Sequence, residues 1–206
     1  MHNGRMQQGA EGIKAEIAAA AARLVVDDGM EYGPAKRQAV RLLGLPVRTP
    51  LPGNDAIEDA VFEHIAIFCA DTQPGELAAL RALAAHWMGR LAAFRPHLSG
   101  SVWSGSATRQ SDIVLDLFCD DSKSAEIDLI NAAIVYQPGT VNGIRGEPVD
   151  VLSISDFSAQ LQTRVTLHLL VYDLDDLRGA LRHGPKGRAA RGDLPALREL
   201  LQSAAP

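Results

Sequence analysis

The stretch GSVWSGSATRQSDIVLDLFC, residues 100–119, decides the fold expected for this chain. Its first part is rich in glycine and serine, which is typical of a turn. Its second part alternates apolar and polar residues, and a period of two predicts a β-strand. One face of that strand carries Ile113, Leu115, Leu117 and Cys119, and the other carries Asp112, Val114, Asp116, Phe118 and Asp120.

The chain after this strand alternates helical and extended patterns. Helices are expected over about 122–132, 174–181 and 194–201, and strands over about 134–136, 149–154 and 165–172. The stretch 137–148 contains two prolines and three glycines, and it is expected to be rich in turns.

Before residue 96 the apolar residues recur every three to four positions, which predicts helices. They are expected over about 12–27, 34–43, 54–68 and 75–94, with a proline-rich linker at 45–53. The chain is therefore predicted to be an α+β protein, with an N-terminal helical segment followed by a mixed-sheet α/β core. The expected organisation is a disordered N-terminus at 1–10, a helical domain at 11–95 and the α/β domain at 96–206.

The composition is that of a folded globular protein, with 206 residues of which 47% are hydrophobic and 22% charged. The net charge of −5 counts against broad nucleic-acid binding, because surfaces that hold phosphate backbones are usually basic. Two distant cysteines, Cys69 and Cys119, predict reduced, buried thiols. No apolar stretch approaches the ~18 residues of a membrane span, and the first residues lack the apolar core of a secretory signal. A cytoplasmic location without a membrane partner is therefore predicted.

The turn and the strand together resemble one known family. Gly100-Ser101, a second glycine at Gly105, and Ser111-Asp112-Ile113 opening the strand are similar to the signature of DNA polymerase beta-type, or minimal, nucleotidyltransferases. A later stretch, Val149-Asp150-Val151-Leu152, matches more weakly the strand in which that family places its third carboxylate.

The resemblance implies a nucleotidyltransferase-like core and transfer of a nucleotidyl group from an NTP, with Mg²⁺, to a hydroxyl of a protein, an RNA or a small molecule. Backbone N–H groups of the turn would hold the triphosphate. By the same resemblance, Asp112 and Asp116 would hold the metal and Asp150 would complete the catalytic set. The nucleotide-binding residues would be Gly100, Ser101, Gly105 and Ser111.

The sequence departs from the family at the second metal-binding position. The family has Asp-x-Asp, whereas Val114 stands two residues after Asp112. The next carboxylate on that face, Asp116, lies about 6.6 Å beyond Val114, the position where the family has its second aspartate. Metal–oxygen distances are only about 2 Å. Three hypotheses stay open: a transferase with altered geometry, a catalytically inactive protein of this fold that binds a nucleotide or a partner protein, and a chance likeness. Whether the protein is an enzyme is therefore left open.

Other residues near these motifs supply further candidates. Arg109, Lys186 and Arg188 are candidates for contacts with phosphate or with the acceptor. The last two belong to a basic, glycine-rich loop at 178–191, for which the alternative is a solvated connection. Trp103 is expected either to stack on a base or to pack on the helix behind it. His168, alone on its strand, is expected to be structural.

The first two helices loosely resemble the helix-turn-helix entry of tetracycline-repressor-like regulators. Lys36, Arg37 and Arg41 make the second helix basic, but Pro46 and Pro50 interrupt the place where a recognition helix would follow. A transcription regulator is therefore a second alternative. A homo-oligomer or a protein partner is compatible with each hypothesis.

Overall fold

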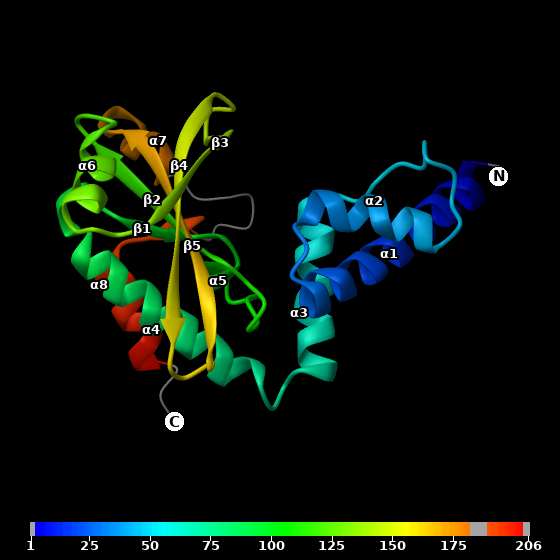
Figure 1. Cartoon of the computed structure of the whole chain (residues 1–206). Helices are drawn as coiled ribbons and strands as arrows, with labels where there is room; N and C mark the ends of the chain where they lie inside the picture. Colours follow the sequence, from blue (N-terminus) through cyan, green and yellow to red (C-terminus); the bar gives the residue numbers. More distant parts are fainter. Residues whose placement is uncertain (1–2, 182–188, 204–206) are drawn as a thin grey trace. The chain divides into compact units, whose positions relative to one another are not determined.

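The computed structural model describes residues 3–181 and 189–203, and it describes side chains from residue 11 onward. The chain divides into two compact units, Met1–Pro74 and Gly75–Pro206. The described part of the first unit is helical, and the second combines helices with a six-stranded mixed sheet (Figure 1). The predicted α+β class is therefore confirmed. Among the described residues, no helix has the length and apolar character needed to cross a membrane.

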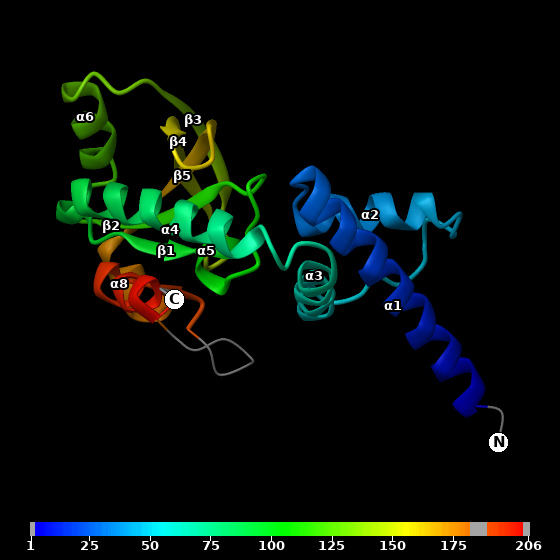
Figure 2. The ribbon, with the colours of Figure 1, turned by 90° about the horizontal axis from the view of Figure 1, so that it is seen from below.

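The N-terminal unit is built from α1 (Asn3–Asp28), α2 (Tyr32–Leu42) and α3 (Asn54–Phe68), and α1 packs against both other helices (Figure 2). Its core is made of small and branched side chains: Ile17, Ala18, Ala21, Ala22, Val26, Ala35, Ala39, Val40, Ile57, Val61 and Ile65. Gly29 and Gly44, with φ of 66° and 64°, follow α1 and α2 closely, in the left-handed conformation common at helix ends.

Two sequence-based boundaries differ from those of the structure. Helix α1 begins at Asn3, within the stretch predicted to be disordered, and no proline interrupts the helix there. The predicted domain boundary at residue 95 is replaced by the division after Pro74, because α4 (Gln73–Arg90) packs its apolar side into the core of the second unit. Its contributions to that core are Leu80, Ala84, Trp87 and Met88.

The sheet has the strand order β3-β4-β5-β2-β1-β6, and β4 and β5 run side by side through the unit (Figure 1). Strands β2 and β5 are parallel, whereas all other neighbours are antiparallel. The bounds are β1 (His97–Ser99), β2 (Ile113–Cys119), β3 (Tyr136–Asn142), β4 (Pro148–Ser158), β5 (Thr163–Asp173) and β6 (Arg191–Gly192).

Strand β3 occupies half of the stretch that was predicted to be rich in turns. It pairs with β4 from Tyr136, opposite Ile154, to Asn142, opposite Pro148, and only residues 143–147 form the turn. Proline and glycine are tolerated at this position because β3 is an edge strand, whose outer backbone groups need no partner strand. The turn-based prediction for 137–142 was therefore wrong.

The two faces of the sheet are covered differently. One face packs on α4, α5 (Gly100–Ser104), α6 (Ser124–Asn131) and α8 (Leu194–Ser203) through a large apolar core. From β2 this core receives the predicted apolar set, Ile113, Leu115, Leu117 and Cys119. On the other face, Phe118 and Tyr172 stack on each other and meet η2 (Leu174–Asp176) and α7 (Leu177–Ala180). We call the face that packs on α4, α5, α6 and α8 the helical face, and the face that carries Phe118 and Tyr172 the open face.

Candidate functional site

One row of residues crosses the whole sheet on the open face. Strand register places these residues side by side, one from each strand, so their side chains project to the same face. In order from β6 to β3 they are Arg191, Ser99, Val114, His168, Ser153 and Gln137. All except Val114 are polar, and all are exposed or half-buried. We call this set the polar row.

The Gly100-Ser101 turn lies against the middle of the polar row. Gly100 has φ of 68° and turns the chain from β1 into α5. A Cβ atom built on Gly100 would lie 3.7 Å from Cγ2 of Val114, so the bare backbone of the turn passes beside that side chain. The structure thus brings Gly100 beside β2, which carries Asp116 and directly follows Asp112. Ser101 lies next in α5, where its carbonyl accepts hydrogen bonds from the backbone N–H groups of Gly105 and Ala107.

The other two predicted nucleotide-binding residues shape the loop. Gly105, with φ of 95°, ends α5, and a Cβ atom there would face Arg81 and Leu77 of α4. Ser111 uses its Oγ to accept a hydrogen bond of 3.0 Å from the backbone N–H of Thr108. These contacts indicate that both residues shape the loop that follows the Gly100-Ser101 turn.

Arg81 is a supporting residue that the sequence did not reveal. It is buried on α4, and its guanidinium donates hydrogen bonds to the carbonyls of Val102 (3.0 Å) and Trp103 (3.2 Å) at the end of α5. Burial lowers the pKa of this guanidinium below its ordinary value. Its backbone partners could not be identified from spacing alone, because they lie 21 and 22 residues away.

Asp112 belongs to a hydrogen-bonded chain that ends at the polar row. Its Oδ2 lies 3.3 Å from Nε2 of His168, and Nδ1 of His168 lies 2.9 Å from Oγ of Ser153. The Asp112 carboxylate is 52% exposed, so solvent and small molecules reach it. The sequence singled out Asp112, assigned His168 a structural role and gave no signal for Ser153, which lies in another strand.

Asp116 follows Val114 by two residues on the open face, where it is buried and engaged by Arg191. The Asp116 residue is 2% exposed, and its Oδ2 lies 2.6 Å from Nη1 of Arg191. Burial raises the pKa of the Asp116 carboxyl above its ordinary value of 3.8, while Arg191, a hydrogen bond from Ser99 and the charge of His97 oppose the rise. Asp116 therefore does not belong to a solvated strand face. It is half of a buried ion pair.

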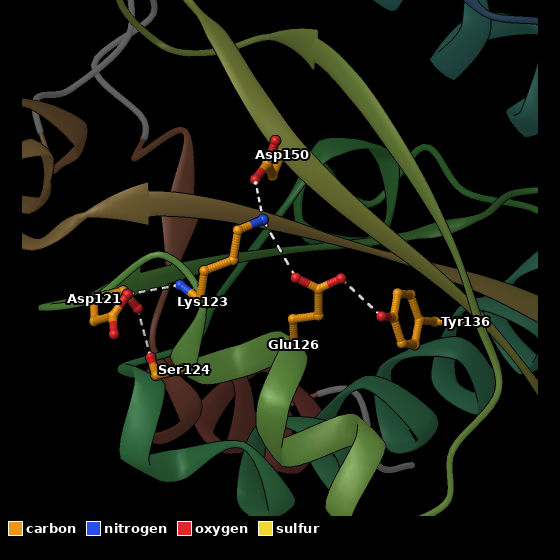
Figure 3. Close-up of polar contacts among 6 residues, drawn as sticks. All are labelled: Asp121, Lys123, Ser124, Glu126, Tyr136 and Asp150. Atoms are coloured by element: carbon orange, nitrogen blue, oxygen red, sulfur yellow. Dashed lines mark hydrogen bonds and ion pairs between the residues drawn. The ribbon is translucent and has the colours of Figure 1, made fainter.

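Asp150 lies on the helical face, away from Asp112 and Asp116. Register places it opposite Val171, a residue of the helical-face core. Its Oδ2 lies 3.3 Å from Nζ of Lys123, which also contacts Glu126 at 3.3 Å, and Glu126 accepts a 2.7 Å hydrogen bond from the hydroxyl of Tyr136 (Figure 3). The three predicted catalytic carboxylates are therefore not brought together.

The arrangement of these carboxylates does not fit the Mg²⁺ ion that the family resemblance implies. Asp116 is four positions after Asp112 along the extended chain, which is about 13 Å, whereas ligands of one ion lie within a few ångströms of each other. Asp116 is already paired with Arg191, and Asp150 is on the other face. Over residues 3–181 and 189–203, no group of three or more His, Cys, Asp or Glu side chains is placed to hold a metal.

The structure describes only one of the three residues predicted to contact phosphate or the acceptor. Arg109 is exposed, and its backbone N–H donates a 2.9 Å hydrogen bond to Glu76. Lys186 and Arg188 lie outside the described residues. Arg191, from the same basic loop, is a described cation that reaches Asp116, although its sequence position does not distinguish it from its neighbours.

Trp103 packs within the protein, but its ring and Nε1 meet β6 and Ala189, whereas the helix behind it was the expected partner. Its Nε1 donates a 2.8 Å hydrogen bond to the carbonyl of Ala189, and its ring lies on Gly192 of β6. This contact fastens α5 to the strand that carries Arg191, so the turn and the ion pair depend on the same packing.

Comparison with protein-family models, curated proteins and solved structures finds no match to this chain. The function is therefore argued from the chemistry of the polar row and the residues around it.

Proposed function

We propose that this protein binds a phosphate-bearing ligand with hydroxyl groups, such as a nucleoside triphosphate, on the polar row, and that it does not transfer the nucleotidyl group. The observation that carries this choice is the position of Asp150. Transfer by the chemistry that the family resemblance implies needs carboxylates that converge on one place, and β4 directs Asp150 to the face opposite Asp112 and Asp116.

The polar row has the donors that phosphate oxygens require. Phosphate oxygens accept hydrogen bonds, and the side chains of serine, histidine and glutamine can donate them, whereas the guanidinium of Arg191 is engaged by Asp116. Gly100 adds a stretch of backbone without a side chain, which allows close approach of a bulky anion. The exposed Asp112 carboxylate can accept hydrogen bonds from sugar hydroxyls, which favours a nucleotide over inorganic phosphate.

The regulator hypothesis receives less support from the first unit. Lys36 is 8% exposed, and its Nζ donates a 2.6 Å hydrogen bond to Oδ1 of Asn54. One of the three cations expected to face nucleic acid is thus used inside the unit. The cytoplasmic location stays a prediction, and an NTP is available there as the ligand.

A thermal unfolding series with each NTP tests the proposal. Both tryptophans, Trp87 and Trp103, belong to the second unit, so their fluorescence reports that unit alone. A ligand at about ten times its Kd stabilises the folded state by about 1.4 kcal/mol, which corresponds to about 3–6 °C for a chain of this size. We expect such a rise with at least one NTP, with or without Mg²⁺.

Variants of the row identify the binding place. The rise is expected to vanish in His168→Ala and to persist in Ser155→Ala, a matched control because Ser155 lies on the same strand and face as Ser153, two residues along. A rise that survives in His168→Ala, or the lack of any rise in the wild type, would show that the row is not a nucleotide site.

Asp150→Asn separates binding on the open face from a transferase site. We expect this variant to keep the full NTP-dependent rise, because Asp150 contacts Lys123 on the helical face. If the rise required both Mg²⁺ and an intact Asp150, the three carboxylates would be acting together and the transferase hypothesis would be preferred.

A further inference from the structure

We infer that Arg191 is the resident cation of Asp116, and that its guanidinium takes the place of a divalent metal ion at this carboxylate. The inference deepens the proposed function and rests on it, since it makes ligand binding on the polar row independent of metal. It also concerns a carboxylate that the family resemblance assigns to Mg²⁺.

The path of the Arg191 side chain supports this role. Arg191 lies on β6, two strands away from β2, and register places it beside Ser99 of β1. To bring Nη1 within 2.6 Å of Asp116 Oδ2, the side chain extends across β1 on the open face. The two side chains are 12% and 3% exposed, so the pair is shielded from water along most of its length.

The surroundings of Asp116 suit one organic cation better than a metal ion. A buried carboxylate needs a compensating charge, and Arg191 supplies it. A divalent ion needs several further oxygen ligands. The residue opposite Asp116 on β1 is His97, whose Nδ1 lies 2.9 Å from the carbonyl of Arg95, and Ser99 contributes only a hydroxyl.

The second nitrogen of interest, Nε of Arg191, also supports the role of Arg191 as the cation of Asp116. Nε of Arg191 is buried and, within the described residues, has no hydrogen-bond partner. A buried donor without an acceptor is unfavourable, so this placement does not maximise the hydrogen bonds of Arg191. What the placement provides is positive charge at Asp116.

Cation replacement tests the inference without any nucleotide, so its failure is distinguishable from failure of the proposed binding. In Arg191→Ala the unfolding midpoint, read by tryptophan fluorescence, is expected to fall. Part of the loss should be regained on adding low millimolar methylguanidinium, by roughly 3 °C, and not with Mn²⁺ or with NaCl of equal ionic strength. The double variant Asp116→Asn, Arg191→Ala should show no recovery.

Two further variants keep the test decisive if Arg191→Ala does not fold. Arg191→Lys keeps the charge and Arg191→Met keeps only the apolar stem, so the lysine variant should have the higher midpoint. Arg145→Ala is a matched control, since Arg145 forms a 2.7 Å pair with Asp176 but is 62% exposed, and no cation should change its midpoint. The inference is overturned if Mn²⁺ raises the midpoint of the wild type or of Arg191→Ala through Asp116, if methylguanidinium does not rescue a folded Arg191→Ala, or if the lysine and methionine variants unfold together.

Discussion

Arg191→Gln is expected to lower the free energy of unfolding of the second unit by about 3–5 kcal/mol, the usual cost of removing one partner of a buried ion pair. The variant leaves the Asp116 carboxylate buried without its cation. Denaturant unfolding followed by tryptophan fluorescence measures the loss. Arg145→Gln should cost at most about 1 kcal/mol, because exposed ion pairs contribute little.

The loss in Arg191→Gln should also depend on pH. The folded-state pKa of Asp116 is already raised above 3.8, and Arg191 is the largest influence that opposes the rise. Without Arg191 the folded pKa rises further. A carboxyl with a raised folded pKa contributes stability below its unfolded pKa, and that stability is lost as pH rises through the folded pKa. The variant should therefore be closest to wild type near pH 3.8 and furthest from it at neutral pH.

A pH-independent loss would contradict this account of the pair. The double variant Asp116→Asn, Arg191→Gln provides a second check, because it replaces two buried charges by two neutral amides. It should be more stable than either single variant. If the two single losses simply added, Asp116 and Arg191 would not be energetically coupled in solution.

Gly192→Ala should have the next largest effect. A Cβ atom on Gly192 would lie 2.0 Å from Cη2 of Trp103, which is far inside van der Waals contact. The indole cannot move aside without breaking its 2.8 Å hydrogen bond to Ala189. Overpacking of this kind costs about 1–3 kcal/mol, and denaturant unfolding of the second unit measures it.

Matched variants separate this clash from a general effect of replacing glycine. Gly139→Ala, in β3, should change stability by less than about 0.5 kcal/mol, since no described atom lies within 4 Å of the added Cβ. Trp103→Leu combined with Gly192→Ala should recover part of the loss, and Trp87 still reports unfolding in that variant. Equal losses in Gly192→Ala and Gly139→Ala would contradict the packing shown here.

The parts of the fold that follow a local period could be predicted from the sequence. The alternation from Ile113 to Cys119 identified β2 and its core-facing set correctly, and the helical repeats identified α2 and α3 to within a few residues. Strand β3 was missed over 137–142 because proline and glycine are typical of turns, and only the tertiary position at the sheet edge makes them acceptable in a strand.

The candidate site was less predictable because it depends on which strands become neighbours. Arg191 and Asp116 are 75 residues apart and meet only because β6 pairs with β1. His168 and Ser153 share a row with Val114 only through the register of β5 with β2 and β4. The alternation in Val149-Asp150-Val151 indicates that the side chain of Asp150 projects to the face opposite that of Val149 and Val151. It does not indicate which of the two faces the helices cover.

Phosphorus NMR of an NTP titrated with the protein, in Mg²⁺, separates binding from transfer, because line broadening reports binding and a pyrophosphate resonance reports transfer of the nucleotidyl group to water or to a hydroxyl of the chain itself. We expect broadening that is lost in His168→Ala and kept in Ser155→Ala, with no pyrophosphate formed. Accumulation of pyrophosphate, or broadening that survives in His168→Ala, would contradict the proposed function.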